Sequence, residues 1–102
     1  MNRIDLLRQY LAKTPDDSFL RHALALEHIK LKEDEDAIGL FQALLEDDPD
    51  YVGSYYHLGR AWERKGETDR ALETYQKGMA VARRLKDDHA YRELQQAADD
   101  LI

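Results

Sequence analysis

Few residues of this 102-residue chain are of a type that could do covalent chemistry. The chain has no cysteine, so thiolate nucleophiles, thiolate metal sites and disulfides are excluded. Its serines are Ser18 and Ser54. Ser54 and His57 lie three positions apart on one expected helix, but no third group is evident to orient the imidazole, as a nucleophilic serine requires. We therefore expect no enzyme activity.

The histidines are the next candidates, as metal ligands. No two of them stand four positions apart, which is the spacing of a helical zinc-ligand pair. His22 and His57 can approach one another across neighbouring helices, but a surface or groove histidine is far more common than a metal ligand. We expect neither a metal nor a cofactor. The four residues are His22, His28, His57 and His89.

A calcium loop is the remaining metal hypothesis. Asp34 and Asp36 begin like an EF-hand loop, and Gly39 fits its central turn. Ile38 and Leu45, however, stand where that loop needs oxygen ligands. The sequence therefore disfavours calcium binding.

The charge distribution limits the classes of partner. A net charge of −6 disfavours nucleic acid, because phosphate contacts need clustered lysine and arginine. The acidic excess falls in the first half, mainly in residues 33–36 and 46–50. We expect these carboxylates at helix starts and turns, where they cap N–H groups and favour the helix dipole. With no apolar run near ~20 residues and no apolar leader, we expect a cytoplasmic protein without a membrane partner.

The elements that must position these side chains show a repeat of 34 residues. Apolar or small residues recur at that spacing, at helical intervals and between charges, as amphipathic helices require. The pattern predicts helices over 3–13, 17–31, 35–46, 51–65, 68–86 and 88–101. The recurring pairs include Pro15 and Pro49, Leu24 and Leu58, Ala37 and Ala71, Ile38 and Leu72, and Phe41 and Tyr75.

Over residues 3 to 84 the chain resembles the tetratricopeptide-repeat family, whose signature reads W-x2-L-G-x2-Y, A-x3-F and P. The resemblance implies an all-α, right-handed superhelix of about six antiparallel helices. It divides one domain, 1–102, into a half-repeat (3–15), two repeats (18–50 and 52–86) and a capping helix (88–102). The second repeat has Tyr55, Leu58, Gly59, Trp62, Ala71 and Tyr75; the first has Arg21, Leu24, Ala25, His28, Ala37, Phe41 and Pro49.

The expected turns have recognisable residues. Gly66 has the left-handed preference that ends a helix, and Thr68 can cap the next one. Lys32 stands in the place of Gly66 in the first repeat, where a side chain is less comfortable. Asp87 and Asp88 can cap the final helix, whose apolar stripe under a polar outer face is typical of a solenoid cap.

The first expected helix matches only the second half of a repeat. Arg3 stands where the repeats have Ala37 and Ala71, so we expect no partner helix to cross there. Leu6 and Tyr10 lie off the stripe that covers the following pair. Because exposed apolar patches often mark interfaces, we expect weak homodimerisation through Leu6 and Tyr10.

The resemblance implies that the first helices of successive repeats line a concave groove for a peptide. One row would be His22, Leu26 and Lys30, and the next Tyr56, Arg60 and Arg64. The alternative is that both rows are ordinary solvated helix faces. Relatives that clamp a C-terminal carboxylate use Lys and Asn where this chain has His22 and Leu26, so chaperone tails are disfavoured. Bordering residues are Phe19, Ile29, Gly53, His57 and Glu63.

The groove cations suggest a class of ligand. Lys30, Arg60 and Arg64, opposed only by Glu63, would attract an acidic peptide, and Leu26 and Tyr56 would hold an apolar anchor. The alternative is that neighbouring carboxylates neutralise the arginines. The sequence thus favours a non-catalytic protein-interaction adaptor; the other hypothesis is a structural module that binds copies of itself.

Overall fold

The computed structural model describes residues 2–102, and within that range every regular element is a helix. The expectation of an all-α fold is therefore confirmed, and helix ends fall within about two residues of those predicted. The helices are α1 (Arg3–Lys13), α2 (Ser18–Lys30), α3 (Asp34–Asp47), α4 (Gly53–Arg64), α5 (Thr68–Arg84) and α6 (Asp88–Asp99). None of them has the length and apolarity needed to cross a membrane.

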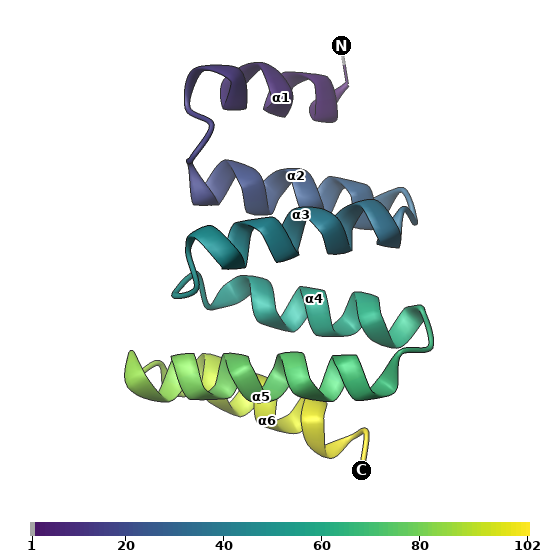
Figure 1. The fold of residues 1–102 in the computed structure, drawn as a ribbon, viewed down its shortest axis with the longest axis vertical. Helices are drawn as coiled ribbons and strands as arrows, with labels where there is room; N and C mark the ends of the chain where they lie inside the picture. The colour runs from purple at the N-terminus through teal and green to yellow at the C-terminus, as the bar shows by residue number, and fades with distance from the viewer. Residues whose placement is uncertain (1) are drawn as a thin grey trace.

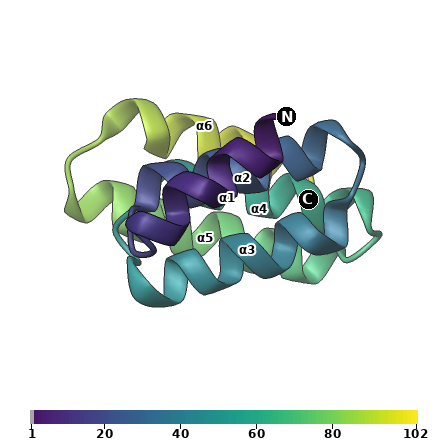
Figure 2. The same cartoon turned by 90° about the horizontal axis from the view of Figure 1, so that it is seen from above.

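The helices stack along the long axis of a molecule that measures 42 × 29 × 19 Å (Figure 1). Each helix contacts the next, and α4 also contacts α2 and α6. Figure 2 shows α3 and α5 together on one side of the molecule and α6 on the other. We refer to the side formed by α2, α4 and α6 as the concave face, and to the side of α3 and α5 as the convex face. Within the described chain α1 contacts α2 alone.

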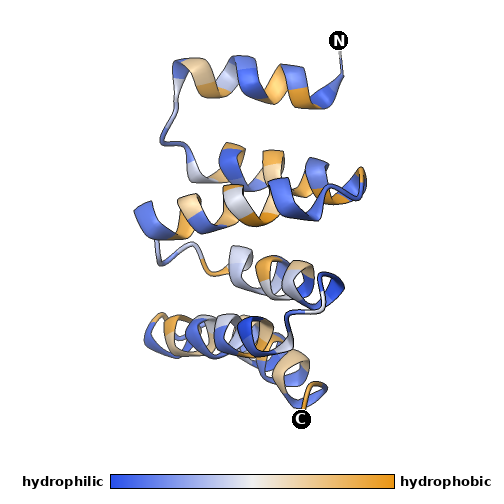
Figure 3. Cartoon of the chain, turned by 45° about the vertical axis from the view of Figure 1, so that its right-hand side comes forward, coloured by the Kyte–Doolittle hydropathy of each residue, from blue (hydrophilic) through white to orange (hydrophobic). Residues whose placement is uncertain are grey.

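Small residues stand where the helices cross closely. Ala25, Ala37 and Ala71 are fully buried, as the repeat pattern predicted. A Cβ added at Gly59 would lie 2.2 Å from the Tyr75 ring, so a larger residue cannot fit there without displacing that ring. Apolar and polar residues are interleaved along each helix (Figure 3), as expected of amphipathic helices.

Three of the turns close in the same way. Lys32, Gly66 and Lys86 have positive φ angles of 61°, 84° and 59°. In each case the next N–H bonds to a carbonyl five residues back, as at Glu67 N to Trp62 O, 2.9 Å. The prediction for Lys32 and Gly66 is confirmed. Helix α5 ends at Arg84 and not near 86, because Lys86 takes the left-handed conformation that stops it.

The capping predictions need two corrections. Thr68 is the first residue of α5 and not its cap; Glu67 holds the cap position and makes no side-chain bond there. The acidic runs 33–36 and 46–50 likewise cap no N–H group by a side chain, although Asp34, Glu35 and Asp36 do stand in the first turn of α3, as expected. Both runs also pair with basic residues of neighbouring helices. Asp87 does cap α6, accepting from Ala90 N at 3.0 Å. The inter-helix pairs are Asp34–Arg64, Glu35–Lys65, Asp47–Arg21 and Asp50–Arg84.

Candidate functional site

The two predicted groove rows lie on adjacent helices that contact one another. On α2, Phe19, His22 and Leu26 follow i, i+3, i+7 spacing and therefore share one face. Phe19 is 66% exposed, which is unusual for a phenylalanine. Leu26 and Tyr56 are half-buried against the core, so each presents only part of its apolar surface.

Between these rows lies a cluster of aromatic rings. The His22 and His57 ring centroids are 5.5 Å apart, as the sequence suggested, and Tyr51 lies 5.4 Å from His22. His22 does not use His57 as a hydrogen-bond partner. Its Nδ1 instead shares a 2.7 Å hydrogen bond with the hydroxyl of Ser54, which is fully buried. Ser54 therefore holds His22 in place and is not accessible to a substrate.

The surroundings of the His22 and His57 imidazoles lower both pKa values and so favour the neutral form. Burial, followed by repulsion from His57, lowers the pKa of His22 to about 4. Burial also lowers the pKa of His57, although Glu93 of α6 opposes that shift. The centre of the concave face is thus uncharged at neutral pH, and its charges lie around it.

The charged residues of the rows all have partners. Lys30 Nζ lies 2.8 Å from Glu27, and an Arg60 nitrogen lies 3.6 Å from Glu63. Arg64 binds both carboxylate oxygens of Asp34, at 3.0–3.1 Å. The prediction that only Glu63 opposes these cations is therefore wrong. It failed because neither additional acidic partner belongs to a predicted row: Glu27 lies on α2 beside its row, and Asp34 lies on α3.

Helix α6 adds residues that the sequence analysis left out of the groove. Its buried Leu94, Ala97 and Ala98 repeat Leu58, Ala61 and Trp62 at a spacing of 36 rather than 34. That spacing places Arg92 and Glu93 in line with Tyr56 and His57. The signal was present in the buried pattern, but the 34-residue period obscured it. No carboxylate lies within 4 Å of Arg92 among residues 2–102.

One group of side chains has the composition of a metal site. The potential ligand atoms of His28, Glu33 and Asp36 lie within 4.8 Å of one another. His28 Nδ1 is 3.0 Å from Glu33, whose carboxylate can only accept, so Nδ1 carries the proton. Moving that proton to the buried Nε2, which has no partner, would cost about 1–3 kcal/mol. The geometry therefore favours a hydrogen bond that closes the α2–α3 turn over metal ligation.

A stacked array of antiparallel helix pairs with a row of first helices on its concave face defines a helical-repeat module. The family model of the tetratricopeptide repeat matches residues 29–98. The chain therefore belongs to the tetratricopeptide-repeat family, as the resemblance predicted.

Several known proteins are similar to it. A TPR repeat-containing protein of Pseudomonas aeruginosa is 30% identical over 91 residues, which are 89% of this chain and 87% of that protein. The crystal structure of a tetratricopeptide repeat domain protein from Salinibacter ruber is 47% identical, with a TM-score of 0.80 over 83% of this chain and 94% of its own. The TPR2B domain of yeast Sti1, solved in complex with pHsp70, is 21% identical. Its TM-score of 0.89, over 96% of this chain and 78% of its own, shows a likeness of fold alone.

Proposed function

We propose that this chain is a non-catalytic protein–protein interaction module that binds a peptide segment along the concave face. In this proposal repeats 18–50 and 52–86 carry the groove, and the half-repeat and the capping helix end it. The observation that carries it is Phe19, which is 66% exposed on the same face of α2 as His22 and Leu26. An apolar side chain of a ligand placed there would remove that surface from water, which contributes about 1.5–3 kcal/mol per large side chain.

The preferred ligand combines that apolar anchor with acidic residues. The side chains of Lys30 and Arg60 are 70% and 49% exposed, whereas those of their partners Glu27 and Glu63 are 14% and 24% exposed. The exposed cationic ends can therefore bind a ligand carboxylate in addition to these partners. Arg92 has no carboxylate partner among residues 2–102, so it is available to a ligand. Arg64 contributes less, because Asp34 already occupies it.

A structure of similar fold in complex supports peptide binding in general, but it does not support the same ligand for this chain. The TPR2B domain of yeast Sti1 shares the fold and is complexed with pHsp70. This chain has His22 and Leu26 where carboxylate-clamp relatives have Lys and Asn. We therefore place chaperone C-termini outside the preferred ligands.

A peptide-library screen followed by titration tests the proposal. We expect acidic sequences with one large apolar residue and micromolar affinity, equivalent to about −8 kcal/mol. Phe19→Ser should weaken binding at least about tenfold, because the anchor loses its contact. Leu31→Ser is the matched control, since Leu31 is 60% exposed at the end of α2 but lies off the Phe19 face. Selection of basic sequences, or equal binding by both variants, would contradict the proposal.

Self-association is a second candidate function, and it rests on α1. Leu6 and Tyr10 are 36% and 49% exposed on a helix that contacts α2 alone within the described chain. We propose that two copies associate weakly through this face. Sedimentation velocity at rising concentration should show a dimer that Tyr10→Ser abolishes. A strict monomer at several hundred micromolar would refute it.

A further inference from the structure

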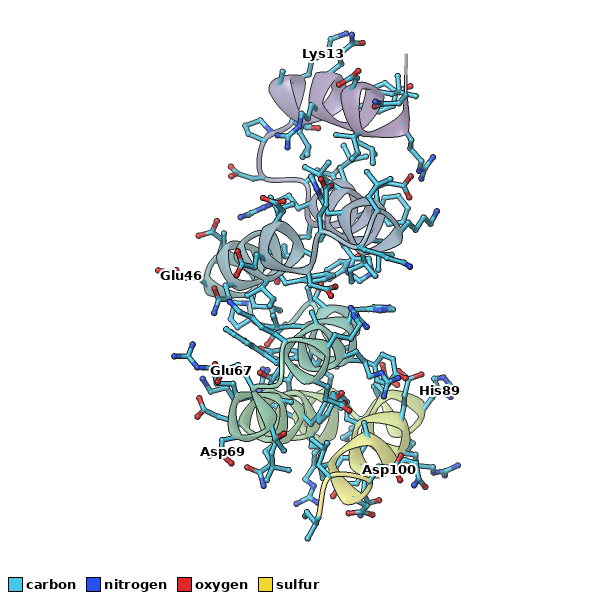
Figure 4. All side chains as sticks on the ribbon, turned by 90° about the vertical axis from the view of Figure 1, so that its right-hand side faces the viewer. Lys13, Glu46, Glu67, Asp69, His89 and Asp100 are labelled. Carbon is cyan, nitrogen blue, oxygen red and sulfur yellow. The ribbon has the colours of Figure 1, made fainter. Side chains whose placement is uncertain are left out.

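A cleft lies on the convex face, away from the groove rows. Its volume is about 550 Å³, within the range of ligand-binding sites. It forms because α3 and α5 both pack on α4 but do not contact each other. In Figure 4 Glu46 of α3 lies on the same side of the molecule as Glu67 and Asp69, and opposite His89 of α6. We call this space the outer cleft; Leu45, Leu58, Trp62 and Arg70 are among its lining residues.

Arg70 gives the outer cleft its chemical character. The Arg70 guanidinium carbon lies 4.9 Å from the centroid of the Trp62 ring. An arginine that stacks on an aromatic ring keeps its in-plane N–H groups available for a carboxylate. No carboxylate lies within 4 Å of Arg70 among residues 2–102. Arg70 is thus held by Trp62 in a position to bind an anion, and its anion site is open.

The other charges of the outer cleft determine the orientation of a bound acidic ligand. Lys77 and Glu73 pair with each other at 3.4 Å and so neutralise one another. Glu46 stands near the end of α3 and therefore beside the start of α4, whereas Arg70 and Trp62 lie at the opposite end of α4. A ligand carboxylate is therefore attracted to the Trp62 end and repelled from the Glu46 end. The apolar contact comes mainly from the half-buried Leu45, since Leu58 is only 6% exposed.

We propose that the outer cleft is a second peptide-binding surface, which takes a partner segment with an apolar side chain next to an acidic one. The apolar side chain packs on Leu45, and both carboxylate oxygens accept hydrogen bonds from the guanidinium of Arg70. This site is independent of the concave face, and a partner can occupy both faces or either one.

The chain contains a built-in reporter for this site. Trp62 is its single tryptophan, so the indole N–H gives one resolved cross-peak in a ¹H–¹⁵N spectrum. The probe is a blocked peptide of two leucines followed by two glutamates. The control peptide has lysines in place of the glutamates. We expect the first peptide to move the Trp62 indole signal saturably and the second to leave it in place.

Substitutions then locate the contact. Arg70→Gln should weaken binding of the acidic peptide at least about fivefold, because the charge-assisted pair is lost. Lys77→Gln, on the same wall, should change it less than about twofold, since Lys77 is already paired. Circular dichroism establishes that both variants are folded. A Trp62 signal unmoved at millimolar peptide, equal binding of the lysine peptide, or an unchanged affinity in Arg70→Gln would overturn the proposal.

A concave-face variant separates this proposal from the function proposed above. Arg60→Glu should leave the Trp62 titration unchanged. If Arg60→Glu abolishes binding while Arg70→Gln does not, the peptide occupies the concave face, and the outer cleft is not a site.

Discussion

The packing of α5 on its neighbours leads to a quantitative prediction for Gly78. A Cβ at this position would lie 2.6 Å from the Cβ of Tyr55 and 2.9 Å from a methyl carbon of Leu94. The Tyr55 Cβ is attached directly to the backbone of α4, and the Tyr55 hydroxyl donates to the carbonyl of Pro49 at 2.7 Å. Tyr55 therefore cannot rotate out of the way, and α4 and α5 must move apart.

The expected cost of Gly78→Ala follows from two opposing effects. Overpacking of this kind costs typically about 1–3 kcal/mol. Alanine is favoured over glycine within a helix by about 1 kcal/mol, which offsets part of that cost. We expect a net loss of about 0–2 kcal/mol in the free energy of unfolding. For a domain of this size a loss of 1 kcal/mol lowers Tm by about 4–8 °C.

Gly39 provides the matched control in the same chain. It lies within α3, and an added Cβ would meet no atom within 4 Å. Gly39→Ala should therefore gain about 0.5–1 kcal/mol from helix propensity alone. Urea titrations followed by circular dichroism at 222 nm measure both free energies. If Gly78→Ala proves as stable as Gly39→Ala, the inferred close contact between α4 and α5 does not exist.

Three further predictions concern acid stability, the core and the turns. The fold lowers the pKa of His22 to about 4, so the unfolded chain takes up a proton first as the pH drops below about 6.5. With solvent screening included, about 2 kcal/mol of the free energy of unfolding is lost by pH 4. Urea titrations at pH 7 and 4.5 should show a smaller loss for His22→Gln than for the parent. Ala71→Arg should cost several kcal/mol or prevent folding, since Ala71 is fully buried, and a cooperative melt near the parent Tm would refute this. Lys32→Gly and Lys86→Gly should each raise stability by up to about 1 kcal/mol by relieving a positive φ, and a lower Tm in both would argue against strain at these turns.

Most of the helical framework could be predicted because it depends on local spacing. The recurrence of Ala37 at Ala71 and of Phe41 at Tyr75 reports which face of a helix is buried, and the structure buries all four residues. The turn at Gly66 could be predicted for the same reason, since a left-handed residue is a local requirement.

The side-chain partners of the groove were less accessible to sequence reasoning. Arg64 reaches Asp34 and His22 reaches Ser54 across helices whose separation depends on the superhelical twist. Helix α6 itself was predicted, but the place of Arg92 and Glu93 on the concave face was missed, because the spacing of α6 departs from the 34-residue period. Gly78 was missed as well, since its importance depends on contacts with Tyr55 and Leu94 that the repeat pattern does not specify.

The contacts between the helices determine the order in which parts of this molecule unfold. Helix α4 touches α2, α3, α5 and α6, whereas α1 touches one neighbour within the described chain. Such a chain behaves like a row of coupled units, in which each unit is stabilised by the neighbours that remain folded. Opening at α4 breaks four interfaces at once, but opening at α1 breaks one. Amide hydrogens should therefore exchange from the α1 end inward, with α4 among the slowest, so the centre of the concave face stays formed while that end frays.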